Sequence, residues 1–353
     1  MDVERGPILV WGAGAIGGTI GAHLVRAGED VTFLDRDRDH VAAMQKKGLS
    51  ITGPIVEFTV EAKAVTADQL QGRFARVFLC VKAQDTADAS RALLPHVTED
   101  GFVVSGQNGL NELTIAKILG EARTMGCFVN FGADYMEPGV IHYAGRGSVL
   151  IGEIDGKETA RLQALHQLLR KFEDRALLTR NIWGYLWGKL AYGSMLIATA
   201  LTNASIADCL ASEPHRRLFI ALARESLAVA AARKVVPEAF DGFDPAAFRS
   251  GVSEAAALGS LDRLVAFNRH SAKTHSGIWR DLAVRKRRTE TEVQLSPVVE
   301  LGSRHGVATP VTARLIELIR DIETGRRAQG WEALDLLGEA VPAQRIASKG
   351  QGS

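Results

Sequence analysis

The residue pattern with the clearest chemical meaning is a glycine-rich turn near the start of the chain. An apolar run, Ile8–Trp11, leads directly into Gly12-Ala13-Gly14-Ala15-Ile16-Gly17. In a dinucleotide-binding fold the first glycine makes a sharp turn, the second lets a pyrophosphate approach the backbone, and the third lets the following helix pack on the strand. The spacing therefore predicts cofactor contacts along this turn, at Gly12, Gly14, Ala15, Ile16 and Gly17.

Charged residues follow the second strand that the pattern predicts. Asp35 ends the run Asp30–Leu34, about where a dinucleotide fold places the carboxylate that binds the adenosine ribose, which favours NAD. Arg36 and Arg38 come next and favour NADP instead. The alternative for Arg36 is that it neutralises Asp35 or Asp37 at the surface.

Strands and helices must alternate to position these residues, and the first half of the chain has that pattern. Alternation of this kind predicts a parallel sheet covered by helices. We expect further strands at Ala75–Val81, Phe102–Ser105, Thr124–Val129, Val140–Tyr143 and Val149–Ile151, the last two forming a sheet edge or an antiparallel hairpin. Helices are expected at Thr19–Arg26, Thr86–Leu94 and Leu162–Phe172. Lys82 and Asn108 follow two of the strands, where ligands collect in such sheets.

From Ile182 onward the pattern is almost wholly helical and rich in Ala and Leu. The expected helices are Leu186–Leu201, Arg217–Arg233, Ser253–Asn268, a long one from Thr274 to Glu290 that extends toward Arg304, and Pro310–Thr324. The predicted fold class is an α/β, Rossmann-like dinucleotide-binding domain at residues 1–180 followed by an all-α domain at residues 181–338. We expect the polar tail, 339–353, to be disordered.

Composition excludes several classes of function. A formal net charge of +1 over 353 residues provides no general field for nucleic acid or an acidic membrane surface. No apolar stretch reaches the length of a membrane span, and no signal peptide is expected ahead of the first strand. The cysteines form no C-x-x-C pair and the histidines no ligand cluster, so we predict no disulfide and no metal site. The expected location is a reducing cytoplasm, and the expected partner is a small molecule.

Several segments, taken in order, resemble the ketopantoate reductase family. Besides the glycine turn they are Val81-Lys82-Ala83, Gln107-Asn108-Gly109, Trp187-Gly188-Lys189-Leu190-Ala191, Arg288-Thr289-Glu290 and His305-Gly306-Val307-Ala308-Thr309-Pro310. The resemblance covers nearly the whole chain. It implies NADPH-dependent reduction of a 2-oxo acid, 2-dehydropantoate or a related small carbonyl acid, to the 2-hydroxy acid, as in pantothenate biosynthesis.

The resemblance also implies roles for single residues. The lysine matching Lys189 protonates the substrate carbonyl, the glutamate matching Glu290 lies beside the substrate, and the asparagine matching Asn108 lies near nicotinamide and substrate. Ser276 matches a ligand of the substrate carboxylate, and Lys82 a contact to cofactor or substrate. Hydride transfer leaves negative charge on the carbonyl oxygen, so a proton donor is needed there. Without the resemblance, Lys189, Glu290 and Lys82 also fit ordinary surface charges.

The cofactor preference follows the same resemblance. An arginine at the position of Arg36 binds the 2′-phosphate in the family, so NADP is favoured, while Asp35 keeps NAD open. A homodimer is compatible with the chain, and the oligomeric state stays undecided, as does the physiological direction of the reaction.

Two departures from the family pattern leave the substrate open. Members that act on ketopantoate have asparagines where this chain has Gly193 and Ile197, and neither residue offers an amide. Two alternatives therefore remain. The first is an opine-type or hydroxy-acid dehydrogenase of the same architecture, for which His275 would be the relevant histidine. The second is a non-catalytic dinucleotide sensor, although the presence of Lys189 and Glu290 speaks against it.

Overall fold

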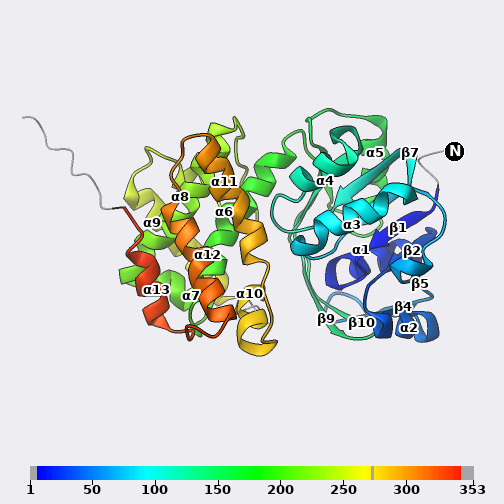
Figure 1. Cartoon of the computed structure of the whole chain (residues 1–353), viewed down its shortest axis with the longest axis horizontal. Helices are drawn as coiled ribbons and strands as arrows, with labels where there is room; N and C mark the ends of the chain where they lie inside the picture. The colour runs from blue at the N-terminus through cyan, green and yellow to red at the C-terminus, as the bar shows by residue number, and fades with distance from the viewer. Residues whose placement is uncertain (1–5, 272–273, 343–353) are drawn as a thin grey trace, which may run out of the picture. The chain divides into compact units, whose positions relative to one another are not determined.

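The computed structural model describes residues 6–271 and 274–342, and the chain divides into two compact units (Figure 1). The first comprises Met1–Lys189 and Val235–Asp241, and the second comprises Leu190–Lys234 and Gly242–Ser353. The division falls inside helix α6 (Ile182–Thr199), later in the chain than the boundary near residue 180 that we expected. Most of the tail expected to be disordered, residues 343–353, lies outside the described residues.

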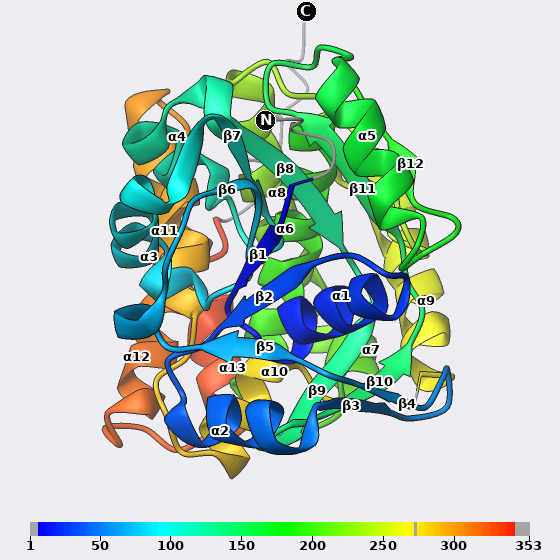
Figure 2. The same ribbon diagram turned by 90° about the vertical axis from the view of Figure 1, so that its right-hand side faces the viewer.

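The first unit is built on an eight-stranded sheet in the order β12-β11-β8-β7-β6-β1-β2-β5. Its strands are β1 (Ile8–Trp11), β2 (Val31–Leu34), β5 (Lys63–Val65), β6 (Phe74–Leu79), β7 (Val97–Ser105), β8 (Thr124–Val129), β11 (Val149–Glu153) and β12 (Leu177–Leu178). Neighbours are parallel, except that β11 runs antiparallel to β8. Strands β6, β1, β2 and β5 lie side by side in Figure 2. The strand order reverses between β1 and β6, which is the point where open α/β sheets bind ligands.

Successive side chains of a strand point to opposite faces of the sheet. Because the central strands are apolar at nearly every position, both faces of the sheet are apolar and both are covered by helices. Ile8 and Val10 of β1 belong to a core with α1 (Ala15–Arg26) and α5 (Ala160–Leu169). Leu9 and Trp11 belong to a second core with α3 (Thr86–Leu93) and α4 (Glu112–Leu119). The predicted α/β architecture of the N-terminal part is therefore confirmed.

A second, four-stranded sheet in the order β4-β3-β10-β9 was not predicted. Its strands are β3 (Leu49–Thr52), β4 (Phe58–Val60), β9 (Gly132–Glu137) and β10 (Val140–Gly145), and α2 (Arg38–Lys47) precedes it in the chain. The sheet packs on α1 so closely that a Cβ at Gly18 would lie 2.2 Å from the Ile141 side chain. We expected residues 140–143 and 149–151 to form a sheet edge or an antiparallel hairpin, and neither alternative holds. Strand β10 lies between β3 and β9 in the second sheet, whereas the fully buried β11 lies between β12 and β8 in the main sheet.

The second unit is helical, as predicted (Figure 1). Beyond α6 it contains α7 (Ile206–Ala211), α8 (Arg216–Ala232), α9 (Glu254–Arg269), α10 (Gly277–Trp279), α11 (Thr291–Arg304), α12 (Pro310–Glu323) and α13 (Trp331–Gly338). None of the helices in the described ranges is long and apolar enough to cross a membrane.

The long helix predicted from Thr274 was wrong, because the chain leaves the helical conformation before residue 290. The short α10 continues into a π-helical turn, Arg280–Val284. The buried Asp281 carboxylate then accepts hydrogen bonds from Arg285 and Arg287, both at 3.0 Å. Lys286 between them adopts a left-handed conformation with φ +51°. These contacts turn the basic segment 285–288 back toward Asp281. Glu290 therefore lies at the N-cap of α11 and not within a helix.

Candidate active site

The three glycines of the turn after β1 have three different surroundings. Gly12 has φ +97°, and a Cβ there would lie 2.7 Å from the backbone of Cys80. At Gly17 a Cβ would lie 2.2 Å from the Gly12 carbonyl oxygen, so only glycine lets α1 pack against β1 this closely. Gly14, the N-cap of α1, has no atom within 4 Å of an added Cβ. The open space lies at the helix N-terminus, where Ala15 and Ile16 begin the helix and backbone N–H groups favour an anion.

Two side chains hold the glycine turn in place through hydrogen bonds to the backbone of Ala13. The Asp35 carboxylate accepts hydrogen bonds from the Ala13 N–H at 2.9 Å and from the Asp37 N–H at 3.0 Å. His40 is buried, and its Nδ1 accepts the Gly139 N–H at 2.9 Å. The proton of the neutral ring is therefore on Nε2, which donates to the Ala13 carbonyl at 3.0 Å. Sequence reasoning missed His40, because an isolated histidine in a helix indicates nothing about its distant partners.

The charged residues at the ends of β2 and β6 lie at the surface. Arg36 is 79% exposed and pairs with Asp85 at 3.1 Å, not with Asp35 or Asp37, within the described part of the chain. Arg38 pairs with Asp68 at 3.7 Å. Lys82 is exposed three residues before Asp85, where it precedes the short 3-10 turn Ala83–Asp85 that follows β6. The alternative that Arg36 neutralises Asp35 or Asp37 is therefore not what the structure shows. Arg36, which follows β2, instead pairs with Asp85, which follows β6.

Lys189 and Asn108 meet within the first unit. The Lys189 ammonium donates a hydrogen bond to the Asn108 amide oxygen at 2.7 Å and another to the Val129 carbonyl at the end of β8. It lies 5.3 Å from the centre of the Phe128 ring, in a cation–π contact. Asn108 is exposed and Lys189 half-buried. Two residues expected to act in one reaction are therefore in direct contact at the carboxyl ends of β7 and β8.

A buried carboxyl group lies in the same region. Glu112, at the first turn of α4, is fully buried, and burial raises its pKa to about 8. The smaller opposing effects on this pKa come, largest first, from its own backbone N–H, from Ser105 and from the Lys189 ammonium. Burial also raises the pKa of the Cys80 thiol to about 12 and raises that of Cys127 as well. Both shifts favour the protonated thiol over the nucleophilic thiolate. The sequence offered no signal for Glu112, since an acidic residue in the first turn of a helix is commonplace.

Glu290 and Ser276 lie in the second unit, and both are buried. The Ser276 hydroxyl accepts a hydrogen bond from the Trp279 N–H at 3.2 Å, which caps α10. The residue before Glu290, Thr289, donates to the Glu323 carboxylate through its N–H at 2.8 Å and its hydroxyl at 2.6 Å. Glu323 of α12 therefore fixes the backbone from which Glu290 projects.

His275, the histidine that the opine-type or hydroxy-acid dehydrogenase alternative would use, makes local contacts in the second unit. The His275 ring stacks on the Trp279 indole with centroids 4.0 Å apart. Its Nδ1 lies 2.9 Å from the Thr274 hydroxyl and its Nε2 lies 3.3 Å from the Asn203 carbonyl oxygen. Nothing in these contacts singles His275 out as an acid or base.

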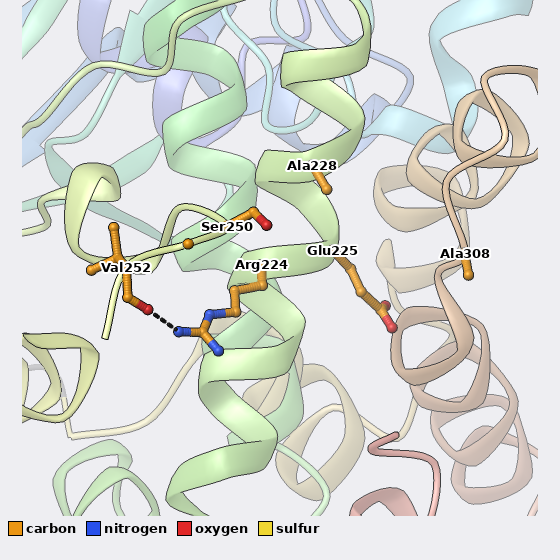
Figure 3. Close-up of a pocket in the computed structure, with 7 residues that line it drawn as sticks. Arg224, Glu225, Ala228, Ser250, Val252 and Ala308 are labelled. Atoms are coloured by element: carbon orange, nitrogen blue, oxygen red, sulfur yellow. Dashed lines mark hydrogen bonds between the residues drawn. The ribbon is translucent and has the colours of Figure 1, made fainter. Parts of the chain in front are cut away.

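Two hollows of the second unit contain none of the expected site residues. One, of about 480 Å³, is lined by Ala266, Phe267, His270 and Ser271. The other, of about 280 Å³, lies beside α8 (Figure 3), where Arg224 donates to the Val252 carbonyl at 3.0 Å. The neighbouring Glu225 carboxylate accepts the N–H groups of Val311 and Thr312 and so caps α12. These contacts are structural. In residues 6–271 and 274–342 no group of three or more His, Cys, Asp or Glu side chains could hold a metal ion.

Comparison with known proteins connects both units to one family. The family model described as ketopantoate reductase PanE/ApbA matches residues 8–156, and the model of its C-terminal part matches residues 181–323. The 2-dehydropantoate 2-reductase of Archaeoglobus fulgidus is 29% identical over 327 residues, which cover 92% of this chain and 100% of the relative.

Solved structures give the same result. The crystal structure of 2-dehydropantoate 2-reductase from Geobacter metallireducens GS-15 is 25% identical with a TM-score of 0.75, and the match covers 91% of this chain and 100% of that one. A ternary structure of D-mandelate dehydrogenase with NADH and anilino(oxo)acetate has the same fold, with a TM-score of 0.77, 21% identity, and coverage of 90% and 98%.

Proposed function

This chain belongs to the ketopantoate reductase family of oxidoreductases, and on that premise we propose that it reduces a 2-oxo acid to the 2-hydroxy acid with a nicotinamide dinucleotide. The observation that carries the proposal is the 2.7 Å hydrogen bond between Lys189 and Asn108 at the carboxyl edge of the main sheet. This hydrogen bond holds the Lys189 ammonium, the proposed proton donor, beside the loop after β7. That loop lies at the carboxyl edge of the sheet, where open α/β sheets bind their ligands.

The residues of the first unit fit a bound dinucleotide. The space in front of Gly14 and the N-terminus of α1 suit a pyrophosphate, while Gly12 and Gly17 are needed for the turn and the packing behind it. The exposed Arg36 suits a 2′-phosphate, which supports NADP over NAD. When bound, the reduced nicotinamide supplies the hydride.

The chain itself supplies the proton and holds the substrate. Lys189 is oriented by the Asn108 amide oxygen and the Val129 carbonyl, so its ammonium is a positioned donor for the alkoxide that forms at the reduced carbonyl. We assign substrate contacts to Glu290, whose backbone is held through Glu323, and to Ser276. Transfer of the Lys189 proton to the oxygen completes the 2-hydroxy acid.

A direct test is oxidation of NADPH and of NADH by the purified chain with a panel of 2-oxo acids that includes 2-dehydropantoate, pyruvate and benzoylformate. We expect turnover with at least one of them and a preference for NADPH. Tight NADPH binding without turnover on any of the 2-oxo acids would favour the dinucleotide sensor. Oxidation that requires an amino acid as co-substrate would favour the opine-type alternative.

A second substrate class is favoured by the residues that follow Lys189 on α6. Gly193 has no atom within 4 Å of an added Cβ, and Ile197 is buried. Neither can provide the amide that the family resemblance places there for ketopantoate. An apolar 2-oxo acid such as benzoylformate needs no such amide, so we expect it to compete with 2-dehydropantoate in kcat/KM. Introducing Gly193→Asn should shift the ratio of kcat/KM toward 2-dehydropantoate.

A further inference from the structure

We propose that Thr86 is a positioning residue of the active site, because its hydroxyl completes a buried relay of hydrogen bonds that holds Asn108 against Lys189. The inference rests on the proposed function, since it assigns Thr86 a part in the same reaction. Neither the family match nor the glycine motif assigns a role to this threonine.

The relay runs in one direction from donor to acceptor. The Gln107 amide nitrogen donates to the Thr86 hydroxyl at 2.7 Å, and the Thr86 hydroxyl donates to the Asn111 amide oxygen at 3.0 Å. The Asn111 amide nitrogen donates to the main-chain carbonyl of Asn108 at 2.7 Å. The side chain of Asn108 then accepts the hydrogen bond from Lys189.

The relay joins two strand ends. Gln107 and Asn111 flank Asn108 in the loop between β7 and α4, whereas Thr86 begins α3 after β6. Gln107 also donates to the Val81 carbonyl at 2.8 Å, so the segment before Lys82 is tied to the same group of side chains. The loops that carry Lys82 and Asn108 are therefore held together by side chains and not only by the sheet.

Burial makes the relay sensitive to the loss of one member. Thr86 is 1%, Gln107 5% and Asn111 6% exposed, so water does not replace a missing partner readily. Asn108 is itself exposed, and within the relay it is held through its main-chain carbonyl, which accepts the hydrogen bond from Asn111. Its orientation toward Lys189 therefore depends on the backbone that Asn111 holds.

Only a hydroxyl fits the middle position. Thr86 accepts one hydrogen bond and donates another, which a hydroxyl can do and a methyl group cannot. In Thr86→Val the shape is kept, but the Gln107 N–H and the Asn111 amide oxygen both lose a partner. We expect Asn111 to rotate toward another donor in this variant, so that the Asn108 carbonyl loses its hydrogen bond.

The experiment compares three variants of the full chain by steady-state kinetics, NADPH titration and thermal unfolding. Thr86→Val should lower kcat by roughly 10-fold to 100-fold, the loss expected from a small misplacement of a catalytic contact, with NADPH affinity nearly unchanged. Thr86→Ser keeps the hydroxyl and should retain most of kcat. Thr124→Val is the matched control, since Thr124 is also buried but donates to the Gly120 carbonyl at 2.9 Å, at the start of β8. It should alter Tm without lowering kcat.

A double-mutant cycle with Asn108→Ala separates positioning from a general loss of stability. If Thr86 acts through Asn108, Thr86→Val should lower kcat much less in the Asn108→Ala background than alone. Equal losses in both backgrounds, or an unchanged kcat in Thr86→Val, would overturn the inference. If Thr86→Val does not fold, Thr86→Ala removes the same hydroxyl with less bulk and is judged by the same criteria.

The same data distinguish failure of this inference from failure of the proposed function. If Asn108→Ala and Lys189→Ala both lower kcat while Thr86→Val does not, only the relay is wrong. If neither Asn108→Ala nor Lys189→Ala lowers kcat, the proposed chemistry itself is wrong, and the role of Thr86 falls with it.

Discussion

The Lys189 ammonium and the Asn108 amide oxygen, 81 positions apart in the chain, are joined by a hydrogen bond of 2.7 Å. The contact forms because α6 passes the ends of β7 and β8, where the Val129 carbonyl accepts a second hydrogen bond from the same ammonium. An ammonium fixed by two acceptors needs little reorganisation before it transfers a proton.

The contact leads to a prediction for Lys189. Lys189→Ala should lower kcat by about 10² to 10⁴, the range for a positioned general acid, with little change in NADPH affinity. The matched control is Lys157→Ala, which removes an exposed lysine of the first unit that pairs with Asp155 at 2.8 Å. Near-full turnover in the Lys189 variant, measured under saturating substrate, would rule out the proposed proton donor.

The different surroundings of Gly14 and Gly17 predict two opposite phenotypes. Gly14→Val points into open space and should keep the fold but lose dinucleotide binding, because the side chain takes the space of the pyrophosphate. Gly17→Val must clash with the Gly12 carbonyl and should lower Tm strongly. Fluorescence titration and thermal unfolding measure the two effects. Normal NADPH affinity in Gly14→Val would count decisively against the site.

Arg36 should discriminate between the two dinucleotides. If its guanidinium binds the 2′-phosphate, Arg36→Ala should weaken NADPH binding by about 1.5 to 3 kcal/mol and leave NADH binding nearly unchanged. Arg91→Ala, which removes an exposed arginine paired with Asp88 at 2.8 Å, is the control. Asp85→Ala frees Arg36 from its ion pair and should strengthen NADPH binding. Equal losses for both dinucleotides in Arg36→Ala would leave the arginine without that role.

Glu290 and its neighbour Glu292 offer a matched pair. Glu290→Ala should raise KM for the 2-oxo acid and also lower kcat, because a residue that orients the substrate acts before and during the reaction. Glu292→Ala removes a carboxylate that pairs with Arg288 and Arg320 and should change neither constant much. His275→Ala should have little effect on kcat. A collapse of kcat in His275→Ala with full activity in Glu290→Ala would favour the histidine-dependent dehydrogenase.

The buried Glu112 makes stability depend on pH. Burial raises its pKa in the folded chain to about 8, whereas in the unfolded chain a glutamate titrates near 4.3. The folded state therefore binds the proton more tightly. This tighter proton binding contributes fully to the free energy of unfolding at a pH below the unfolded pKa. The contribution is lost as the pH rises through the folded pKa of about 8. Glu112→Gln cannot ionise, so its Tm relative to the unmodified chain should rise between pH 5 and pH 8.5, measured by thermal unfolding at several pH values. A constant Tm difference would show that Glu112 does not titrate in this range.

The local pattern of the sequence determined the α/β part and the glycine turn. Ile8–Trp11 is apolar at every position, which suits a strand buried on both faces, and Gly12 precedes a helix at the place where a positive φ is required. Both properties depend on residues that are adjacent in the chain. The same holds for the helical character after Ile182, because a period of 3.6 residues is visible within a few turns.

Only the tertiary structure decided the contacts between distant segments. The second sheet pairs Ser50 with Val140, and the His40 side chain forms hydrogen bonds with the backbones of Ala13 and Gly139. The local sequence pattern contains no signal for either contact. The break in the predicted helix after Val284 likewise depends on the buried Asp281, whose burial is set by packing.

The candidate site shows the same division. Glycine spacing indicated the dinucleotide turn, and the family resemblance indicated Lys189, Asn108 and Glu290. The hydrogen bond between Lys189 and Asn108 and the relay through Thr86 required the folded chain. Periodicity and turn residues report the conformation of neighbouring residues, whereas a hydrogen bond between strand ends depends on how the whole sheet is assembled, and that assembly is a property of all its strands together.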